Sequence, residues 1–539
     1  MASDFPTERP SELEQEFHRA LHVPARAQTV RLKEILRQNA TSEYGQSFSF
    51  EKLQTPEDYQ SAVPIVRYED ICPHIEKIRR GAANVLTTES VLRFHVSSGT
   101  TSASKIIPFT ASLRREFAKS IELWLWNIRD RRSQAVLGRS YWVVSASAES
   151  SQRWEGAVPV EFDQDASYLP ERLQPWFVSA QCVPHELSRV TKQDHLLFLT
   201  AVFLLLENEL SLISLWSPSF WITISQFIRA EKHTLVADIA NDLKVFRKLC
   251  ALYNLPIGCW SPEVLKVRAA EVENADLDWR RIWPCLSLIS SWTDGFAATQ
   301  VESLQTDFPG VPIQGKGLLA TEGVVTIPFD TKDGMGLAPV LVPNAHFYEF
   351  RSTSSGRVSL AHQLVQGDEY EVILTTGGGL YRYQLGDKVV VDGSCHATPR
   401  LRFLSKTERV SDLCGEKLHE EHVKRSLDCI LSQFGLRNRF VFLAPSDSEE
   451  CLRYRLFAAG ALSHQLRAAL EEQLERSLCE NFNYALCRRN GQLEPVQVQV
   501  VTEQASVVYK EHKARFSRLS TVKTSCFDTE TGWERVFAI

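Results

Sequence analysis

The N-terminal part of the chain repeats apolar side chains at the spacing of an amphipathic helix. Leu13, Phe17 and Leu21 follow this spacing, and the pattern resumes after a break at Pro24. Proline is tolerated at the start of a helix but not in its interior, because it lacks the backbone N–H that the interior requires. We therefore predict two helices within residues 11–39 that meet at Pro24.

Two short apolar runs, residues 91–96 and 141–145, are typical of buried strands because they are rich in β-branched and aromatic side chains. Between them, residues 110–130 carry apolar side chains at helical spacing. The order of strand, polar segment, helix and strand indicates an α/β layer. Further along, residues 186–274 are predicted to be mostly helical.

The second half of the chain alternates more strands with helices. Strands are predicted at residues 286–289, 311–313, 318–320, 340–342 and 346–350. A hairpin is predicted from residues 369–374 and 380–385, which are joined across Thr375-Thr376-Gly377-Gly378-Gly379. After it, the pattern predicts helices at residues 420–434 and 463–479, and strands at residues 439–444, 453–458 and 496–501. The predicted fold class is α/β.

The composition argues against two classes of binding partner, nucleic acids and membranes. The chain has 539 residues, of which 44% are hydrophobic and 23% charged, close to the usual values for a globular protein. A net charge of -6 argues against a dedicated nucleic-acid binder. The longest strongly apolar stretch, Leu196 to Leu206, is too short to span a bilayer and is expected to form a core helix. We therefore expect neither nucleic-acid binding nor membrane insertion.

The cysteines suggest a reducing compartment. Twelve of them lie between Cys72 and Cys526, and no pair has the C-x-x-C spacing of a zinc knuckle or a thioredoxin-type motif. In so long a chain they are expected to be buried, reduced thiols. Because the first residues also lack an apolar signal-peptide core, we expect a cytoplasmic protein.

One polar segment has the character of a phosphate cradle. It follows the first predicted strand and reads Ser97-Ser98-Gly99-Thr100-Thr101-Ser102-Ala103-Ser104-Lys105. Small residues let the backbone approach an anion, hydroxyls and N–H groups donate hydrogen bonds, and lysine adds a positive charge. The spacing of a Walker A loop is absent. From the residues alone, a segment of this composition is more often an ordinary polar loop.

Two acidic residues stand at the ends of predicted strands. Glu322 follows Ala320-Thr321, where a carboxylate can hold a magnesium ion against substrate phosphates. Asp387 ends the segment Leu380-Tyr381-Arg382-Tyr383-Gln384-Leu385-Gly386-Asp387, where a carboxylate can accept hydrogen bonds from ribose hydroxyls. The alternative for each is an acid that caps a turn or forms a salt bridge.

Taken together, these three segments resemble the motifs of the acyl acid amido synthetases, the plant auxin-conjugating enzymes with bacterial and animal relatives. That family is a branch of the acyl-adenylate-forming superfamily, which includes firefly luciferase. The resemblance extends to residues 39–45, 63–70 and 367–372 and so covers most of the chain. It implies a large N-terminal domain with β-sheets, a β-barrel element and helices, here residues 1–405. A smaller mobile α/β lid domain, here residues 406–539, would follow.

The resemblance also implies an activity. An acyl acid would attack ATP to give an acyl-adenylate and pyrophosphate, and the amine of an amino acid would then take the acyl group and release AMP. Magnesium would be required. Two alternatives stay open: transfer of the acyl group to a thiol of coenzyme A or of a carrier protein, and a relative that binds nucleotide or ligand without catalysis. The identity of the acid and the amine, and the oligomeric state, are not encoded in these motifs.

Site residues follow from the resemblance by position. The phosphates would be held by Ser97, Ser98, Gly99, Thr100 and Thr101. Residues Ala320, Thr321 and Glu322 would serve the phosphate, with Glu322 also on the metal. Asp387 would bind the ribose, while Phe403 and Lys406 would complete the nucleotide site.

A lysine from the C-terminal part would act in catalysis. Residues 520–526 resemble the late family segment that carries it, which makes Lys523 the candidate, with Lys510 and Lys513 as alternatives. The chain departs from the family at Leu318, where many relatives have tyrosine, and at Lys406, where arginine is usual. Lysine lacks the bidentate fork of arginine, so nucleotide affinity could differ. Residues 103–104 also replace a glycine that is common in the first motif.

Overall fold

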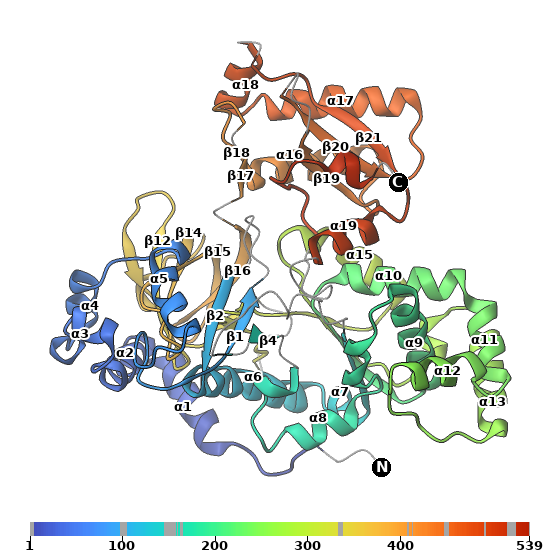
Figure 1. Ribbon diagram of the computed structural model, residues 1–539, viewed down its shortest axis with the longest axis horizontal. Coiled ribbons are helices and arrows are strands. Elements are labelled where there is room, and N and C mark those ends of the chain that lie inside the picture. Colours follow the sequence, from blue (N-terminus) through green and yellow to red (C-terminus); the bar gives the residue numbers. More distant parts are fainter. Residues whose placement is uncertain are drawn as a thin grey trace.

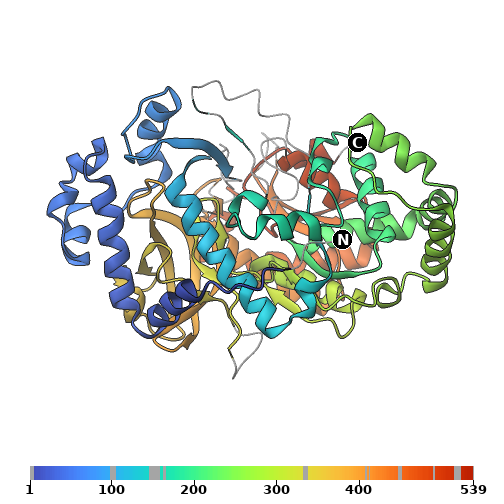
Figure 2. The same ribbon diagram turned by 90° about the horizontal axis from the view of Figure 1, so that it is seen from below.

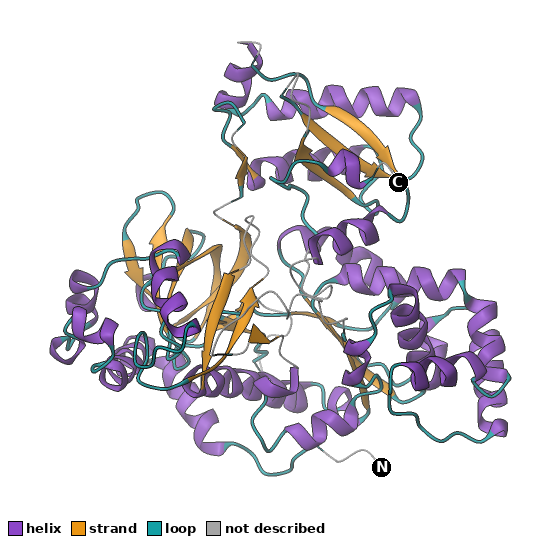
Figure 3. Ribbon diagram, viewed as in Figure 1, coloured by secondary structure: helices purple, strands orange, loops and turns teal. Residues whose placement is uncertain are grey.

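The fold is that of a computed structural model, which describes residues 5–97, 105–144, 158, 160–161, 165–331, 338–406, 409–411, 413–446, 452–489, 492–514 and 524–537. Helices and strands alternate along the chain, and the strands form several separate sheets (Figures 1 and 3). The α/β class predicted from the sequence is confirmed.

The first helices meet at Pro24, as the apolar spacing predicts. They are α1 (Ser11–His22) and α2 (Pro24–Asn39), and Pro24 is the first residue of α2. Three further helices follow, α3 (Glu43–Ser47), α4 (Pro56–Ala62) and α5 (Tyr68–Arg79). Leu32 and Ile35 of α2 pack in the same hydrophobic cluster as residues of the large antiparallel sheet, so this helix covers one face of that sheet.

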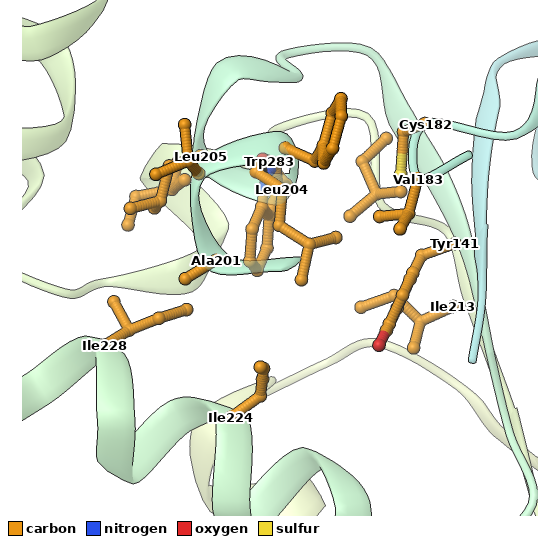
Figure 4. Close-up of a cluster of buried hydrophobic side chains, with 14 of the residues drawn as sticks. Tyr141, Cys182, Val183, Ala201, Leu204, Leu205, Ile213, Ile224, Ile228 and Trp283 are labelled. Carbon is orange, nitrogen blue, oxygen red and sulfur yellow. Dashed lines mark hydrogen bonds between the residues drawn. The ribbon is translucent and has the colours of Figure 1, made fainter. Parts of the chain in front are cut away.

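A parallel four-stranded sheet lies in the middle of the chain. Its order is β3 (Arg139–Trp142), β5 (Leu210–Leu215), β6 (Leu288–Ser291) and β7 (Ile313–Gly315). Side chains alternate between its two faces: Tyr141 and Ile213 lie in one hydrophobic cluster, and Leu212 and Leu288 lie in another. Figure 4 shows Tyr141 and Ile213 facing side chains of the helical layer such as Leu204. Both faces of this sheet are therefore buried.

The helical layer on that sheet consists mainly of α9 (Gln193–Leu206), α10 (Pro218–Ala230), α11 (Lys232–Ala240), α12 (Lys244–Leu252) and α13 (Pro262–Ala275). The apolar stretch expected to be a core helix is α9, and most of its residues are buried. The shorter helices of this part of the chain are α7 (Gln134–Leu137), α8 (Gln174–Ala180), α14 (Trp279–Ile282) and α15 (Val301–Asp307).

The predicted α/β layer around the first motif differs from the structure. β1 (Val91–Ser97) pairs with β2 (Lys105–Thr110) in antiparallel fashion and with β4 (Val160–Glu161) in parallel fashion, whereas β3 belongs to a different sheet. The reason is the β-branched run before Pro108, which pairs with β1 before the helix α6 (Ala111–Arg131) begins. The first motif therefore joins two antiparallel strands. In Figure 2, α6 crosses the molecule between the blue N-terminal helices and the green helical layer.

The largest sheet among the described residues has seven antiparallel strands. Its order is β10 (Thr326–Ile327), β11 (Val340–Leu341), β16 (Thr398–Lys406), β15 (Tyr383–Cys395), β14 (Glu369–Thr375), β12 (Phe347–Ser352) and β13 (Val358–Leu360). The sheet is open, with β10 and β13 at its edges. The predicted hairpin is confirmed as β14 and β15, although β15 begins at Tyr383. It begins late because Arg382 has a left-handed φ of 47°.

The C-terminal residues form a sheet of their own, drawn in orange and red at the top of Figure 1. Its order is β19 (Val441–Pro445), β20 (Tyr454–Ala459) and β21 (Gln497–Val501). Around it lie β17 (Val410–Ser411), β18 (Leu418–His419), α16 (Glu420–Gln433), α17 (His464–Leu478), α18 (Phe482–Arg489), α19 (Ala505–Ala514) and α20 (Trp533–Val536). The helices and strands predicted here are confirmed to within a few residues.

Two lysines connect the C-terminal elements to the rest of the molecule. Lys388 of β15 lies 2.7 Å from the carboxylate of Glu369 on β14 and 2.8 Å from that of Glu421 on α16. Lys510 of α19 donates hydrogen bonds to the carbonyl oxygen of Ser219 at 3.0 Å and to the hydroxyl of Thr223 at 3.3 Å, both on α10. These contacts join α16 to β15 of the large antiparallel sheet and α19 to α10 of the helical layer.

Candidate active site

The first motif lies between the antiparallel strands β1 and β2. Ser97 ends β1 and pairs with Lys105, the first residue of β2. The residues between them, which include Ser98, Gly99, Thr100 and Thr101, lie outside the described part of the chain. The ammonium of Lys105 lies 5.6 Å from the centre of the Tyr68 ring.

The second motif forms the turn of a short hairpin. β8 (Leu319–Ala320) pairs with β9 (Gly323–Val324), and Thr321 and Glu322 occupy the turn between them. Glu322 is only 8% exposed. Burial raises the pKa of its carboxyl group, and the charge of Asp387 acts in the same direction, although Lys406 and Lys105 oppose it. The prediction that Glu322 stands at a strand end is confirmed.

Asp387 and Lys406 face each other across neighbouring strands. They are register partners on β15 and β16, and Lys406 Nζ lies 2.5 Å from Asp387 Oδ1. Asp387 is 2% exposed. Burial lowers the pKa of Lys406, but the charges of Asp387 and Glu322 outweigh burial, and the net shift is upward. We call Glu322, Asp387 and Lys406 the site cluster.

Phe403 lies next to this cluster on β16. Its backbone N–H donates to the Asp294 carboxylate at 3.1 Å, and its ring meets the Trp292 ring edge-on with 5.3 Å between centroids. A side chain at Gly295, which has a φ of 62°, would approach the Phe403 ring to 3.1 Å. The loop after β6 therefore packs closely against the ring of Phe403, which the resemblance assigns to the nucleotide site.

Three residues of the third motif, Tyr381, Arg382 and Tyr383, are buried among other parts of the fold and stabilise it. The Arg382 guanidinium forms two hydrogen bonds of 2.9 Å with the Glu349 carboxylate and also donates to the carbonyl oxygen of Val63. Tyr381 donates to the carbonyl oxygen of Leu86, and Tyr383 is 1% exposed. These contacts fix the chain just before it reaches Asp387.

A second group of buried charges supports the Glu322 hairpin, and sequence reasoning missed it. The Glu116 carboxylate of α6 accepts a hydrogen bond from Arg31 and one from the N–H of Gly377 at 2.8 Å. It lies 2.9 Å from Nδ1 of His346. We call Arg31, Glu116 and His346 the support cluster. Burial raises the pKa of Glu116, but His346 and Arg31 outweigh burial, and the net shift is downward.

His346 connects the support cluster to the hairpin. Its Nε2 accepts the N–H of Val324 at 3.0 Å, so the ring proton sits on Nδ1 and points to Glu116. A Cβ at Gly323 would lie 2.8 Å from Nε2, which is why glycine is needed there. No spacing in the sequence indicates this group, because its members are distant along the chain and meet only in the fold.

The structure describes the surroundings of two of the three candidate lysines. Lys523 lies outside the described residues. Lys510 is 4% exposed, and burial lowers its pKa to about 7. Lys513 forms ion pairs with Asp528 at 2.9 Å and with Glu530 at 2.8 Å. Lys510 and Lys513 are therefore both engaged in contacts away from the site cluster.

The departure at Leu318 fits the local packing. Leu318 is 6% exposed, and its backbone N–H donates to the Thr326 hydroxyl at 2.8 Å.

The carboxylate oxygens of Glu322 and Asp387 are hard donors of the kind that magnesium binds.

Among the described residues, no helix combines the length and apolar character needed to cross a membrane.

Two family models match the chain: the GH3 family N-terminal domain over residues 13–313 and the GH3 family central domain over residues 339–406. Among relatives from Oryza sativa subsp. japonica, a probable indole-3-acetic acid-amido synthetase GH3.12 is 25% identical, over 76% of this chain and 74% of its own. A jasmonoyl--L-amino acid synthetase GH3.5 is 24% identical, over 77% of this chain and 76% of its own.

Solved structures share the fold. The GH3.15 acyl acid amido synthetase matches with a TM-score of 0.80 at 19% identity, over 99% of this chain and 96% of its own. A 2-hydroxyisobutyryl-CoA ligase in the postadenylation state matches with a TM-score of 0.55 at 11% identity, over 97% and 93%. Because the N-terminal family model alone spans more than half of the sequence, the chain belongs to the GH3 family, which confirms the resemblance seen in its motifs.

Proposed function

We propose that the protein is an ATP-dependent ligase that adenylates an acyl acid and transfers the acyl group to the amine of an amino acid. The observation that carries this proposal is the site cluster, which joins the second and third motifs in a chain of the GH3 family. Relatives are named as amido synthetases for indole-3-acetic acid and as jasmonoyl-amino acid synthetases. Their products are amides, which favours an amine over a thiol as the acceptor.

Each motif has a role in this proposal. Ser97, Ser98, Gly99, Thr100 and Thr101 bind phosphate oxygens, and Thr321 and Ala320 line the same site. Asp387 accepts hydrogen bonds from the ribose hydroxyls, and Phe403 flanks the base. Glu322 would hold magnesium, whose charge would stabilise the phosphate oxygens.

The chemistry explains why cations gather here. Negative charge builds on the α-phosphoryl oxygens when the acid carboxylate attacks, so fixed positive groups lower the barrier. Lys406 is one such group, held by Asp387 at 2.5 Å. Lys523 is proposed to reach the α-phosphate from the C-terminal domain during adenylation. The attacking amine then displaces AMP from the acyl-adenylate.

We also propose a domain boundary between residues 405 and 406. Support comes from the hydrophobic clusters of the C-terminal part, whose members all follow residue 412 in the sequence.

We propose a cytoplasmic location because the cysteines of the described residues are all free thiols.

The test is acid-dependent release of pyrophosphate from ATP and magnesium, over a panel of aromatic, jasmonate-like and fatty acids. Asp387→Ala and Lys523→Ala should each reduce the release by about 100-fold. Asp392→Ala is the matched control, because Asp392 lies on the same strand β15 but is 51% exposed. With the active acid in hand, amino acids and coenzyme A are compared as acceptors.

Three results would count against the proposal. Failure to bind ATP would exclude adenylation. A thioester product in place of an amide would exclude the amido synthetase assignment. Equal loss of pyrophosphate release in Asp387→Ala and Asp392→Ala would remove the site cluster from the reaction.

A further inference from the structure

Three side chains with metal-binding atoms meet in the C-terminal part of the chain, away from the site cluster. Cys414 and Glu416 lie in the loop between β17 and β18, and Cys487 lies on α18. The two sulfur atoms and one carboxylate oxygen all lie within 4.8 Å of one another. The cysteines are 73 residues apart, so no sequence spacing indicates the group. We call these three residues the thiol cluster.

Four hydrogen-bond donors orient the Glu416 carboxylate. Its Oε1 accepts two hydrogen bonds, from the N–H of Leu413 at 2.7 Å and from the hydroxyl of Tyr454 at 2.5 Å. Its Oε2 accepts the N–H of Cys414 at 2.8 Å and a hydrogen bond from the thiol of that residue at 3.5 Å. A carboxylate offers about four lone pairs, so a metal ion that replaced the thiol proton would face the lone pair that now accepts it.

Within the described part of the chain, no cationic side chain pairs with the Glu416 carboxylate. Glu416 is fully buried, and none of the ion pairs among the described residues includes it. The arginine of the neighbouring helix, Arg488, pairs with Glu475 at 2.5 Å and donates to the carbonyl oxygen of Leu493. A buried carboxylate without a cation is unfavourable, and a bound metal ion would supply the positive charge.

The two thiols complete a ligand set. Cys487 is 4% exposed, and its sulfur lies 3.5 Å from the carbonyl oxygen of Cys414. Cys414 is partly exposed, which gives an ion access from solvent. Two thiolates with one carboxylate oxygen are ligands that zinc accepts, and thiolates disfavour magnesium and calcium.

We propose that Cys414, Cys487 and Oε2 of Glu416 bind one zinc ion, with a fourth position open toward the solvent side of Cys414. Binding exchanges the two thiol protons for Zn²⁺, and both protons leave to solvent. The Leu413 N–H and the Tyr454 hydroxyl orient the carboxylate from behind. The ion ties α18 to the loop before β18. This site is independent of the proposed ligase activity.

The experiment uses the full chain, stripped with a chelator and then supplied with zinc or with cobalt as a spectroscopic probe. The unmodified chain should retain about one zinc ion per molecule after gel filtration, and cobalt should give a thiolate charge-transfer band. Zinc should raise the unfolding temperature. The pair Cys414→Ser with Cys487→Ser should lose the bound zinc, the cobalt band and the rise in unfolding temperature.

A second pair of cysteines provides the matched control. Cys429 and Cys479 belong to the same region but lie outside the thiol cluster, so Cys429→Ser with Cys479→Ser should bind zinc like the unmodified chain. Far-UV circular dichroism establishes that both variants fold. Glu416→Gln should keep the cobalt band but shift it and weaken zinc retention, since one ligand changes.

Two outcomes would overturn the proposal. One is equal zinc retention by the two paired variants and the unmodified chain, or no retention by any of them. The other is a disulfide between Cys414 and Cys487 in the purified protein, detected as a linked peptide in a non-reducing digest, because the two thiols would then be unavailable to a metal.

Discussion

The support cluster and the site cluster are both buried groups of charge that contact the Glu322 hairpin, yet their charges are balanced in opposite ways. In the support cluster, one carboxylate receives Arg31, His346 and a backbone N–H, and the pKa of Glu116 is lowered. In the site cluster, two carboxylates share the ion-pairing lysine Lys406, and the pKa of Glu322 is raised. In the first arrangement the positive groups outweigh the cost of burial for the carboxylate, whereas in the second they do not, and a bound cation could offset that cost for Glu322.

This comparison separates stability from activity. A buried carboxylate with its full set of partners holds structure, and removal of one partner leaves the others unpaired. A buried carboxylate that lacks partners lowers the stability of the fold. Proteins keep such a group where a bound ligand supplies the missing partner. Variants in the two clusters should therefore affect different measurements.

The largest effect is expected from Glu116→Ala. Arg31, His346 and the Gly377 N–H would lose their common acceptor, at a cost of about 3–5 kcal/mol in the free energy of unfolding. Urea unfolding followed by tryptophan fluorescence measures this change. Glu34→Ala is the control, since Glu34 also pairs with Arg31 but is 55% exposed, and it should cost under about 0.5 kcal/mol. Equal losses of unfolding free energy in Glu116→Ala and Glu34→Ala would contradict a structural role for the support cluster.

A smaller effect, and on turnover, is expected from Lys406→Met. Acid-dependent pyrophosphate release should fall by about 100-fold, because a positive group beside the phosphates is lost. Lys406→Arg keeps the charge and should retain most of the activity. The unfolding free energy should also fall in Lys406→Met, because the buried carboxylate of Asp387 loses its ion-pairing partner, but by less than in Glu116→Ala, since the Lys406 side chain is 34% exposed. Pyrophosphate release that falls only as far as the folded fraction falls would place Lys406 among the structural residues.

A third test uses Lys510, a buried lysine that forms no ion pair with any carboxylate among the described residues. Burial lowers the pKa of Lys510 from 10.5 to about 7, so between these values the unfolded chain binds more protons than the native one. Stability should therefore rise with pH above about 7, by at most about 1.4 kcal/mol per pH unit. Below pH 7 both states bind the proton, so the slope disappears and the destabilisation by the buried charge is at its full size. Lys510→Met should remove the slope between pH 7 and 9 in thermal unfolding, and an unchanged slope would contradict the assignment.

The smallest effect on stability is expected from Glu322→Gln. Because burial raises the pKa of Glu322, ionisation of this carboxyl group costs more in the native state than in the unfolded one, so stability falls as pH rises through the raised pKa. The neutral amide should slightly raise the unfolding temperature at neutral pH in the absence of magnesium. Magnesium should stabilise the unmodified chain but not the variant. A variant that is less stable than the unmodified chain without magnesium would show that Glu322 is a structural residue.

Local signals in the sequence predicted much of the fold. The break at Pro24, the strand ends at Glu322 and the hairpin before Asp387 depend on neighbouring residues, and all three are confirmed. Sheet membership depends on pairing between distant segments, and there the prediction for residues 91–145 was wrong.

The site was predicted less completely than the fold. Motifs indicated Glu322, Asp387 and Lys406, but nothing in their spacing indicated the ion pair between the last two. Glu116 and His346 carried no signal at all, since a single glutamate on an apolar helix reads as a solvent-exposed position. Their partners come from α2, β9 and the glycine loop before β15, which only the folded chain brings together.

Asp387 and Lys388 are neighbours on β15 whose side chains point to opposite faces of one strand. One pairs with Lys406 in the site cluster, and the other pairs with Glu421 of α16. A single residue inserted just upstream of Asp387 in this strand would move Asp387 to the face that Lys388 now occupies and would leave the site position without its acid. In a mutational scan, insertions at this point of β15 should therefore be among the least tolerated in the chain, whereas insertions in the turn between β15 and β16 should be accepted.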